Sequence, residues 1–238
     1  MLRYYFDIII SLPHIIYYIL KIKYIMRHQD RYSEEYRYMV ASNMVHIVMK
    51  HGRIRTEFSG TENLPSNGGY LMYANHQGRF DSLGIIYAHE KPCSIVIDEI
   101  RSRMILVTEF TDVLDGIRLD KSDMKKQVRS IKALADRVAA GKRYIIFPEG
   151  GHNHNRNELQ EFLSGAFKAA LWSKAPIVPV ALIDSYVPFE INSLRKVTTK
   201  VRFLRPISYS EYKDMNTNEI SDLVKNLIGD AVAAETAG

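Results

Sequence analysis

Residues 70–88 read YLMYANHQGRFDSLGIIYA and decide the fold that we expect. Residues 70–74 are almost wholly apolar, which is typical of a strand covered on both faces. A polar loop containing one glycine follows, and residues 82–88 then have the composition of a helix. A strand, a loop and a helix in succession form the repeating unit of an α/β fold.

The same alternation continues through the rest of the chain. Strands are predicted at residues 94–97, 144–147, 177–182 and 197–203, and helices at residues 122–140, 165–173 and 221–234. We therefore expect an α/β fold with a mixed, mostly parallel sheet flanked by helices. We assign this domain to residues 58–238, and residues 1–57 to an N-terminal helical segment that associates with a membrane.

The N-terminal segment contains the longest uncharged stretch of the chain, IIISLPHIIYYIL at residues 8–20. A helix that crosses a bilayer needs about 20 apolar residues. This stretch is shorter, and Pro13 and His14 interrupt it, so we do not expect a clean transmembrane helix. A cleavable signal is not expected either, because no small-residue cleavage site follows.

An interfacial helix explains this segment better, although a helix buried in the protein's own core remains an alternative. Its tyrosines would lie at headgroup depth and its cations would meet anionic lipids. A second helix, at residues 33–50 with Ser33 as N-cap, would complete a two-helix hairpin. These expectations place the protein on the cytoplasmic face of the cell membrane, as a monotopic or peripheral protein. The residues concerned are Tyr4, Tyr5, Tyr17, Tyr18, Tyr24, Lys21, Lys23 and Arg27.

The charge distribution favours one class of partner, and the cysteine content excludes two kinds of site. The net charge is +5, and residues 1–60 contain nine Lys/Arg against five Asp/Glu, so most of the excess lies beside the apolar stretch. Basic charge next to apolar surface favours an anionic membrane over nucleic acid as partner. The single cysteine, Cys93, excludes an internal disulfide and a multi-cysteine metal site.

The loop after the strand at residues 70–74 holds the strongest chemical signal, His76 and Asp81. Side chains five positions apart cannot share one helical face, but they meet if His76 lies in the loop and Asp81 in the first helical turn. Asp81 would then fix the imidazole tautomer and leave the other ring nitrogen as a base. This spacing is common by chance, and a helix-capping Asp beside a surface His is the alternative.

Two further motifs follow predicted strands. Residues 147–151, FPEGG, end a strand with Glu149 and a glycine pair that permits a tight turn and a close backbone approach to a ligand. Residues 116–121, GIRLDK, place Arg118 and Lys121 where they could hold a phosphate. For residues 147–151 the alternative is an ordinary turn, and for residues 116–121 it is a solvated basic surface.

In this order, the motifs resemble those of the glycerolipid acyltransferases typified by 1-acyl-sn-glycerol-3-phosphate acyltransferase. Residues 75–81 resemble that family's N-H-x-x-x-x-D block, residues 147–150 the start of its F-P-E-G-T-R block, and residues 177–180 its fourth block. Residues 116–121 resemble a shortened second block, and the likeness covers roughly residues 58–205. Gly151 and His152 stand where Thr and Arg are usual, and Lys121 replaces Arg, so the headgroup is less firmly implied than acyl transfer.

The resemblance implies acyl transfer from a thioester donor to the free sn-2 hydroxyl of lysophosphatidate, giving phosphatidate. His76 would act as general base and Asp81 would orient it, with oxyanion donors near Gly78 or Gly150. No covalent enzyme intermediate, bound cofactor or metal is expected. The donor would be acyl-CoA, acyl-acyl carrier protein or acyl phosphate. The partners would be the two lipids, an anionic membrane and, where it carries the donor, acyl carrier protein, but no nucleic acid. The substrate-binding residues implied are Arg79, Arg118, Lys121, Glu149 and Gly150.

Three other functions remain open at this point. The acceptor could be a different lysophospholipid, or the His–Asp pair could activate water as an acyl-thioester hydrolase. The third is a membrane-binding protein without catalytic activity. The intact pair of a base, His76, and an orienting carboxylate, Asp81, argues against it. His152 and His154 could suggest a metal site, but the sequence supplies no third ligand for it.

Overall fold

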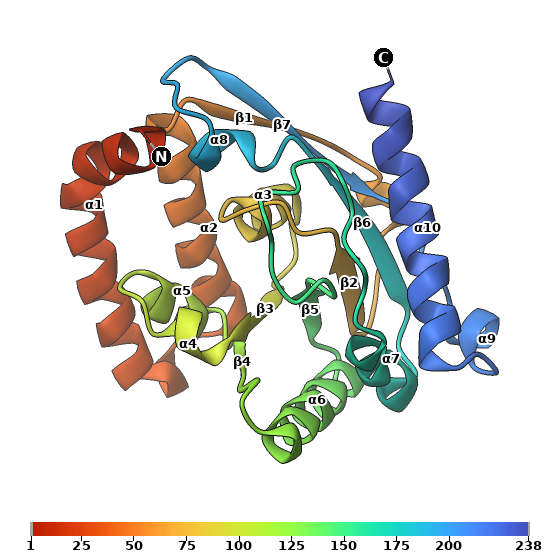
Figure 1. The fold of residues 1–238 in the computed structure, drawn as a ribbon. Coiled ribbons are helices and arrows are strands. Elements are labelled where there is room, and N and C mark those ends of the chain that lie inside the picture. Colours follow the sequence, from red (N-terminus) through yellow and green to blue (C-terminus); the bar gives the residue numbers. More distant parts are fainter. Residues whose placement is uncertain (1, 238) are drawn as a thin grey trace.

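The structure is a computed structural model that describes residues 2–237 (Figure 1). Within these residues seven strands form one sheet, in the order β1-β7-β6-β2-β5-β3-β4. The strands are β1 (Ile54–Ser59), β2 (Tyr70–Ala74), β3 (Ser94–Asp98), β4 (Ile117–Leu119), β5 (Arg143–Ile146), β6 (Ile177–Ile183) and β7 (Val197–Phe203).

The sheet is mixed and mostly parallel, as predicted. Neighbouring strands run parallel everywhere except at β6 and β7, which pair antiparallel. Strands β2 to β6 therefore all end at the same edge of the sheet. The loops that leave their carboxyl ends are brought together there, where ligands bind in open α/β sheets.

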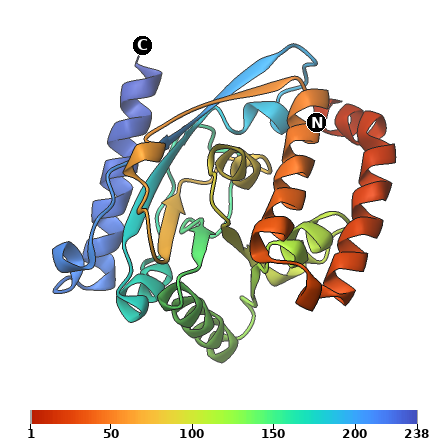
Figure 2. The same ribbon diagram turned by 180° about the vertical axis from the view of Figure 1, so that it is seen from behind.

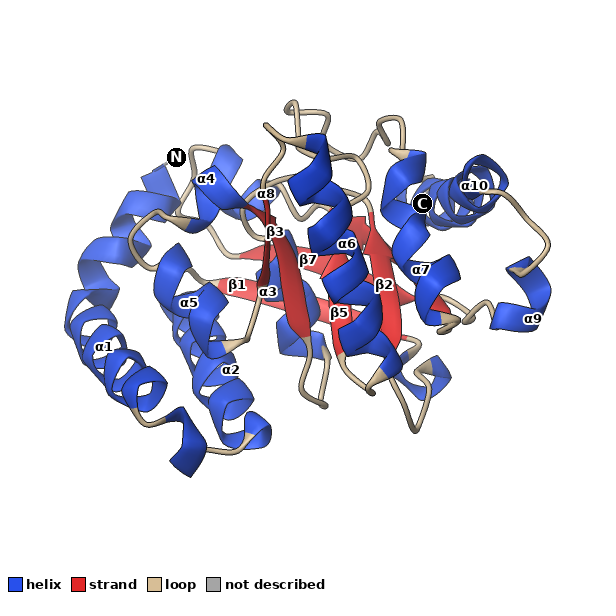
Figure 3. Cartoon of the chain, turned by 90° about the horizontal axis from the view of Figure 1, so that it is seen from below, coloured by secondary structure: helices blue, strands red, loops and turns tan. Residues whose placement is uncertain are grey.

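Helices cover both faces of the sheet, and Figures 1 and 2 show them on its two sides. The first core contains residues of α1, α2 and α3, and the second contains residues of α6, α7 and α10, whose cover over the strands is visible in Figure 3. The helices are α1 (Leu2–Arg27), α2 (Glu34–His51), α3 (Asp81–Ala88), α4 (Glu99–Ser102), α5 (Val107–Val113), α6 (Met124–Ala139), α7 (Lys168–Ser173), α8 (Val187–Glu190), α9 (Tyr209–Tyr212) and α10 (Thr217–Thr236).

Strand β2 shows why its sequence is apolar throughout. Tyr70, Met72 and Ala74 belong to the first core, whereas Leu71 and Tyr73 belong to the second. Side chains alternate between the faces of a strand, and here both faces are covered. Burial on both sides fixes the direction of β2 and thus the place where the loop with His76 begins.

The N-terminal hairpin forms, but α1 is longer than the sequence predicted. It runs without a break from Leu2 to Arg27, so the expectation that Pro13 and His14 interrupt it is wrong. A proline inside a helix costs about 3 kcal/mol. Contacts of α1 with α2, α5 and α8 stabilise the helix against that cost. In α2, the predicted N-cap is confirmed, since Ser33 Oγ accepts a hydrogen bond from the Tyr36 N–H at 3.2 Å.

In a helix on a protein surface the buried side is usually apolar and the exposed side polar, and α1 shows the opposite arrangement. Its buried side includes Arg3, Asp7 and Ser11. Arg3 donates hydrogen bonds to the carbonyls of Pro188 and Arg195, and burial raises the pKa of Asp7 to about 7. The exposed apolar residues are Leu2, Tyr5, Ile9, Ile10, Leu12, Ile16, Tyr17, Leu20 and Tyr24.

This exposure decides between the alternatives for α1. The helix is long and apolar enough to cross a membrane by length and composition, a test that core helices and signal sequences also pass. Only 17% of its apolar window is buried, so it is not a helix of the protein's own core.

Several elements differ from those expected. Strand β1 was not predicted, and because it begins at Ile54 the predicted boundary between residues 57 and 58 falls inside it. The short helices α4, α5, α8 and α9 were not predicted either. All of them are seven residues or shorter, too short for an apolar period to be recognised.

Candidate active site

His76 and Asp81 meet at the carboxyl edge of the sheet, as their spacing predicts. His76 lies in the loop after β2, and Asp81 is the first residue of α3. His76 Nδ1 and Asp81 Oδ2 are 2.6 Å apart. A carboxylate that accepts the Nδ1–H fixes the tautomer and leaves Nε2 as the nitrogen able to take a proton.

Asp81 is held rigidly. Its side chain is 1% exposed, against 16% for His76. Besides the imidazole, Oδ2 accepts the backbone N–H groups of Gln77 at 2.6 Å and Gly78 at 2.9 Å. Three donors on one oxygen stabilise the ionised carboxylate inside the protein and fix its position relative to the ring.

The loop that carries His76 is anchored to β6 by two amides whose role the sequence did not reveal. Asn75 Nδ2 donates to the Leu182 carbonyl at 3.0 Å, and Asn75 Oδ1 accepts the Leu182 N–H at 2.8 Å. Gln77 Nε2 donates to the same carbonyl, while its Oε1 accepts the Ser185 N–H. Both amides are buried, so neither is free to bind substrate.

The loop after β5 supports His76 from another side. The Phe147 ring stacks on the imidazole with centroids 4.5 Å apart. Glu149 Oε1 accepts the backbone N–H of His76 at 3.0 Å, and Oε2 accepts Gln160 Nε2 at 2.7 Å. Burial raises the pKa of Glu149. Both oxygens of Glu149 are thus engaged with protein groups that set the position of His76.

The two backbone N–H groups expected as oxyanion donors are already engaged. The Gly78 N–H donates to Asp81 Oδ2, and the Gly150 N–H donates to the Phe147 carbonyl at 3.1 Å. Gly150 instead has a conformational role. Its φ is +73°, and a Cβ there would lie 2.8 Å from Leu163 Cδ1. The positive φ favours glycine at this turn, whereas the exposed Leu163 side chain could move away from a Cβ.

A second imidazole adjoins His76 and was not predicted to do so. The His152 ring packs edge-on against that of His76, with centroids 5.0 Å apart. Its Nδ1 lies 3.6 Å from Glu190 Oε1, and Glu190 Oε2 is 3.0 Å from His154 Nδ1. Burial and then His76 lower the pKa of His152.

The sequence model of a family described as Acyltransferase matches residues 55–183, which include His76, Asp81 and Glu149. The chain belongs to this acyltransferase family.

Relatives with assigned names point in the same direction. The chain is 28% identical to 1-acyl-sn-glycerol-3-phosphate acyltransferase alpha of Ovis aries, over 77% of this chain and 64% of that protein. It is 23% identical to a probable 1-acyl-sn-glycerol-3-phosphate acyltransferase of Mycoplasma pneumoniae, over 82% and 77%. An uncharacterized protein of Mycobacterium leprae is 35% identical over 55% of this chain, which matches 37% of that protein. The chain thus spans less than two thirds of the length of the Ovis aries and Mycobacterium leprae proteins.

The fold also matches a solved structure. The crystal structure of the 1-acyl-sn-glycerophosphate acyltransferase PlsC from Thermotoga maritima superposes with a TM-score of 0.81, covering 100% of this chain and 96% of that one. At 16% sequence identity this likeness shows the fold.

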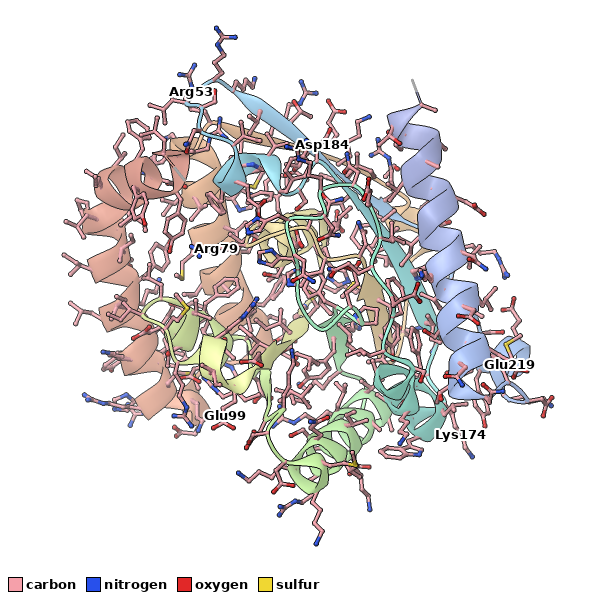
Figure 4. All side chains as sticks on the ribbon, in the orientation of Figure 1. Arg53, Arg79, Glu99, Lys174, Asp184 and Glu219 are labelled. Atoms are coloured by element: carbon pink, nitrogen blue, oxygen red, sulfur yellow. The ribbon has the colours of Figure 1, made fainter. Side chains whose placement is uncertain are left out.

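In this chain the three predicted phosphate-binding cations lie in different surroundings. Arg118 is bonded to Asp112 at 2.6 Å and to Ser102. Lys121 Nζ donates to the Gly150 carbonyl at 2.5 Å, which brings it to the loop that carries Glu149. Arg79, labelled in Figure 4, is exposed and lies over the Tyr4 ring of α1, 5.2 Å from its centroid.

A fourth cation, Arg101 on α4, was not predicted. Its charge is one of those that lower the pKa of His152, so it lies within electrostatic reach of the site. The sequence held no signal for it, because Arg101 lies outside the motifs and α4 has only four residues.

Proposed function

We propose that this protein transfers a fatty acyl group from a thioester donor to the free sn-2 hydroxyl of lysophosphatidate at a membrane surface, giving phosphatidate. The observation that carries the proposal is the 2.6 Å contact between His76 Nδ1 and the buried Asp81 carboxylate. The names of the relatives from Ovis aries and Mycoplasma pneumoniae support the acceptor.

In the proposed reaction, His76 Nε2 removes the proton from the acceptor hydroxyl as its oxygen attacks the thioester carbonyl. Asp81 stabilises the imidazolium that forms, and collapse of the tetrahedral intermediate breaks the C–S bond and releases the thiolate. The imidazolium then returns a proton to the leaving group. A positioned general base contributes about 10² to 10⁴ in rate.

Direct transfer, without an acyl-enzyme, fits the state of the single cysteine. Cys93 is 4% exposed, and burial raises the pKa of its thiol to about 12. A thiol, unlike a thiolate, is a poor nucleophile. The attacking oxygen is therefore assigned to the acceptor lipid.

For the acceptor phosphate we propose two cationic contacts: Arg79 of the His76 loop, and Lys121, which bonds to the Gly150 carbonyl of the neighbouring loop. Arg118 would join them only by giving up its bond to Asp112. Glu149 and Gly150 would affect the substrate indirectly, because they set the shape of the loop beside His76. The thioester donor would be acyl-CoA or acyl-acyl carrier protein. With acyl phosphate in its place, a C–O bond would break and phosphate would leave, and an assay decides among the three.

The exposed apolar side of α1 supports a location on the membrane surface. The helix presents nine large apolar side chains to solvent, and Lys21, Lys23 and Arg27 follow at its carboxyl end. An apolar face with flanking cations is typical of interfacial helices. We propose a peripheral or monotopic protein on the cytoplasmic leaflet, where anionic lipids attract those cations.

The test is an assay of purified protein on lysophosphatidate with acyl-CoA, acyl-acyl carrier protein and acyl phosphate as donors, with lipid products separated. Phosphatidate is expected from the wild type, and at least about 10²-fold less from His76→Ala with its fold retained. Free fatty acid without phosphatidate would indicate a hydrolase. Product from another lysophospholipid alone would replace the acceptor, and wild-type turnover by His76→Ala would remove the assignment of the base.

A further inference from the structure

Three large apolar side chains are exposed on the short segment between β3 and α5. Ile100 and Ile105 are each 82% exposed, and Met104 is 52% exposed. We refer to Ile100, Met104 and Ile105 as the β3–α5 patch. Single exposed apolar residues are ordinary, but several within six positions of one segment mark a surface that contacts another apolar phase.

The β3–α5 patch borders the candidate active site. Asp98, the last residue of β3, caps α4 by accepting the Ile100 N–H at 3.0 Å. Its other oxygen lies 3.6 Å from Lys121 Nζ, which in turn bonds to the Gly150 carbonyl. A chain of direct contacts therefore joins the patch to the loop after β5, in which Glu149 accepts the His76 N–H. The segment leaves the sheet at the same carboxyl edge as that loop.

The patch also lies next to the N-terminal hairpin. Helix α5, which follows it directly, packs on both α1 and α2 (Figures 1 and 3). An ion pair between Lys23 of α1 and Glu109 of α5, 3.7 Å apart, joins the two segments. The exposed apolar side of α1 and the β3–α5 patch thus belong to neighbouring parts of the molecule, although they are far apart in sequence.

Cations alternate with the apolar residues of the segment. Arg101 and Arg103 are both exposed, and Arg103 pairs with Glu99 at 2.6 Å. The Arg101 side chain has no acidic partner among the ion pairs of residues 2–237. Exposed isoleucines interleaved with arginines suit a surface where acyl chains and anionic headgroups meet.

We propose that the β3–α5 patch inserts into the bilayer surface as a second membrane contact, beside α1, and holds the sheet edge that carries His76 against the lipid. This inference deepens the proposed function and rests on it, because an acceptor that stays in the bilayer must be reached by the site. Insertion of the patch brings Lys121 to headgroup depth without withdrawing the lipid from the membrane.

The first experiment compares two double variants of the full chain. Ile100→Ser with Ile105→Ser removes the patch. Trp172→Ser with Leu227→Ser removes two exposed apolar side chains from α7 and α10. In the lower part of Figure 4, Glu99, the first residue of α4, is labelled to the left and Lys174, which follows α7, to the right. Binding to vesicles of phosphatidylcholine and phosphatidylglycerol is measured by co-sedimentation.

The patch variant is expected to bind these vesicles about tenfold more weakly or worse, and the control variant as the wild type does. Acylation of acceptor in vesicles should fall in parallel, whereas turnover of a short-chain acceptor dissolved as monomers should be unchanged. Equal vesicle affinity of the patch and control variants would overturn the inference and leave the proposed function intact, as expected if the patch instead docked a protein.

A second experiment needs no turnover, so it stands even if the proposed function fails. The chain has one tryptophan, which Trp172→Phe removes, and Ile105→Trp then places a single probe in the patch. On vesicle addition its emission should shift to the blue, and brominated acyl chains should quench it. Emission unchanged by vesicles that the protein binds would refute insertion.

Discussion

Asp81 Oδ2 accepts three hydrogen bonds, and two of them come from the backbone of the loop that carries His76. The carboxylate therefore both shapes this loop and stabilises charge on the imidazole. Asp81→Asn keeps an amide oxygen for the donors but removes the negative charge. We expect kcat to fall by about 10² or more with little change in KM for the acceptor, because the charge matters most when the imidazolium forms.

Steady-state kinetics on both substrates measure this change, with circular dichroism to confirm folding. Asp222→Asn is the matched control, since it removes an exposed carboxylate of α10, outside the loop. A normal kcat in Asp81→Asn would show that the carboxylate only shapes the loop.

The sequence predicted the contact of His76 with Asp81 because both lie within one loop and helix start. It could not predict the contacts of Asn75 with Leu182 or of Glu149 with the His76 backbone. These join positions 107 and 73 residues apart, and no local pattern records such pairs. The pair of Arg118 and Asp112 shows a different limit, because Asp112 is only six residues away but lies on α5, a helix that was not predicted.

The loop between β5 and α7 contains two adjacent glycines that differ in backbone conformation and in the space around them. Gly150 has a φ of +73° and a Leu163 atom within 2.8 Å of a would-be Cβ, whereas Gly151 has nothing within 4 Å. Gly150→Ala should shift the loop, displace Glu149 from the His76 N–H and lower kcat by about tenfold, since strain of about 1–3 kcal/mol must be relieved. Gly151→Ala should keep wild-type kinetics and melting temperature. Equal effects of the two substitutions would contradict this account.

Helix α1 should make stability depend on pH through Asp7. Burial raises the pKa of Asp7 from 3.8 to about 7, so the folded protein holds this proton more tightly than the unfolded chain. Stability is therefore lost as pH rises between those two values. Asp7→Asn is expected to match the wild type near pH 4 and to be more stable by up to about 4 kcal/mol near pH 8.

Urea unfolding of both proteins at the two pH values checks this expectation. A control in Asp30→Asn, an acid of the η1 turn Gln29–Arg31 that carries no buried side chain, should show no such pH-dependent difference. A wild type that gains stability over Asp7→Asn with rising pH would reverse the sign and refute the buried-carboxyl explanation.

Among the strands, those buried on both faces were the easiest to predict from sequence patterns, whereas β1 was missed. Strands β2 and β6 are buried along their whole length, and their apolar runs were visible. Strand β1 lies at the sheet edge and is partly exposed, so its sequence IRTEFS has no continuous apolar run. Edge strands commonly carry charges that discourage pairing with other chains.

In the whole molecule, the loops of the candidate active site and the exposed apolar surface lie next to each other. Parallel strands bring the loops with His76 and Glu149, and the segment with the β3–α5 patch, to one edge of the sheet. Arg79 of the first loop lies over Tyr4 of α1, and buried Arg3 ties the start of α1 to the region after β6. Contacts between such distant segments could not be read from the chain, because they follow from the sheet order.

This arrangement leads to a prediction for the anchoring helix. Ile9, Ile16 and Leu20 are 71%, 52% and 64% exposed on α1, so replacing all three by Ser should leave the thermal midpoint within about 2 °C of the wild type. Each side chain inserted into lipid contributes about 1–2 kcal/mol, so vesicle binding should fall by at least about 10²-fold. Co-sedimentation with the same vesicles measures the loss.

The activity of the triple α1 variant distinguishes anchoring from catalysis. If α1 acts only by holding the protein at the lipid, turnover of a monomeric short-chain acceptor should equal that of the wild type while acylation of vesicle lipid falls. Because Tyr4 contacts Arg79, a coupled loss of both activities would instead mean that α1 shapes the acceptor site. Undiminished vesicle binding would show that the exposed side of α1 is not the membrane contact.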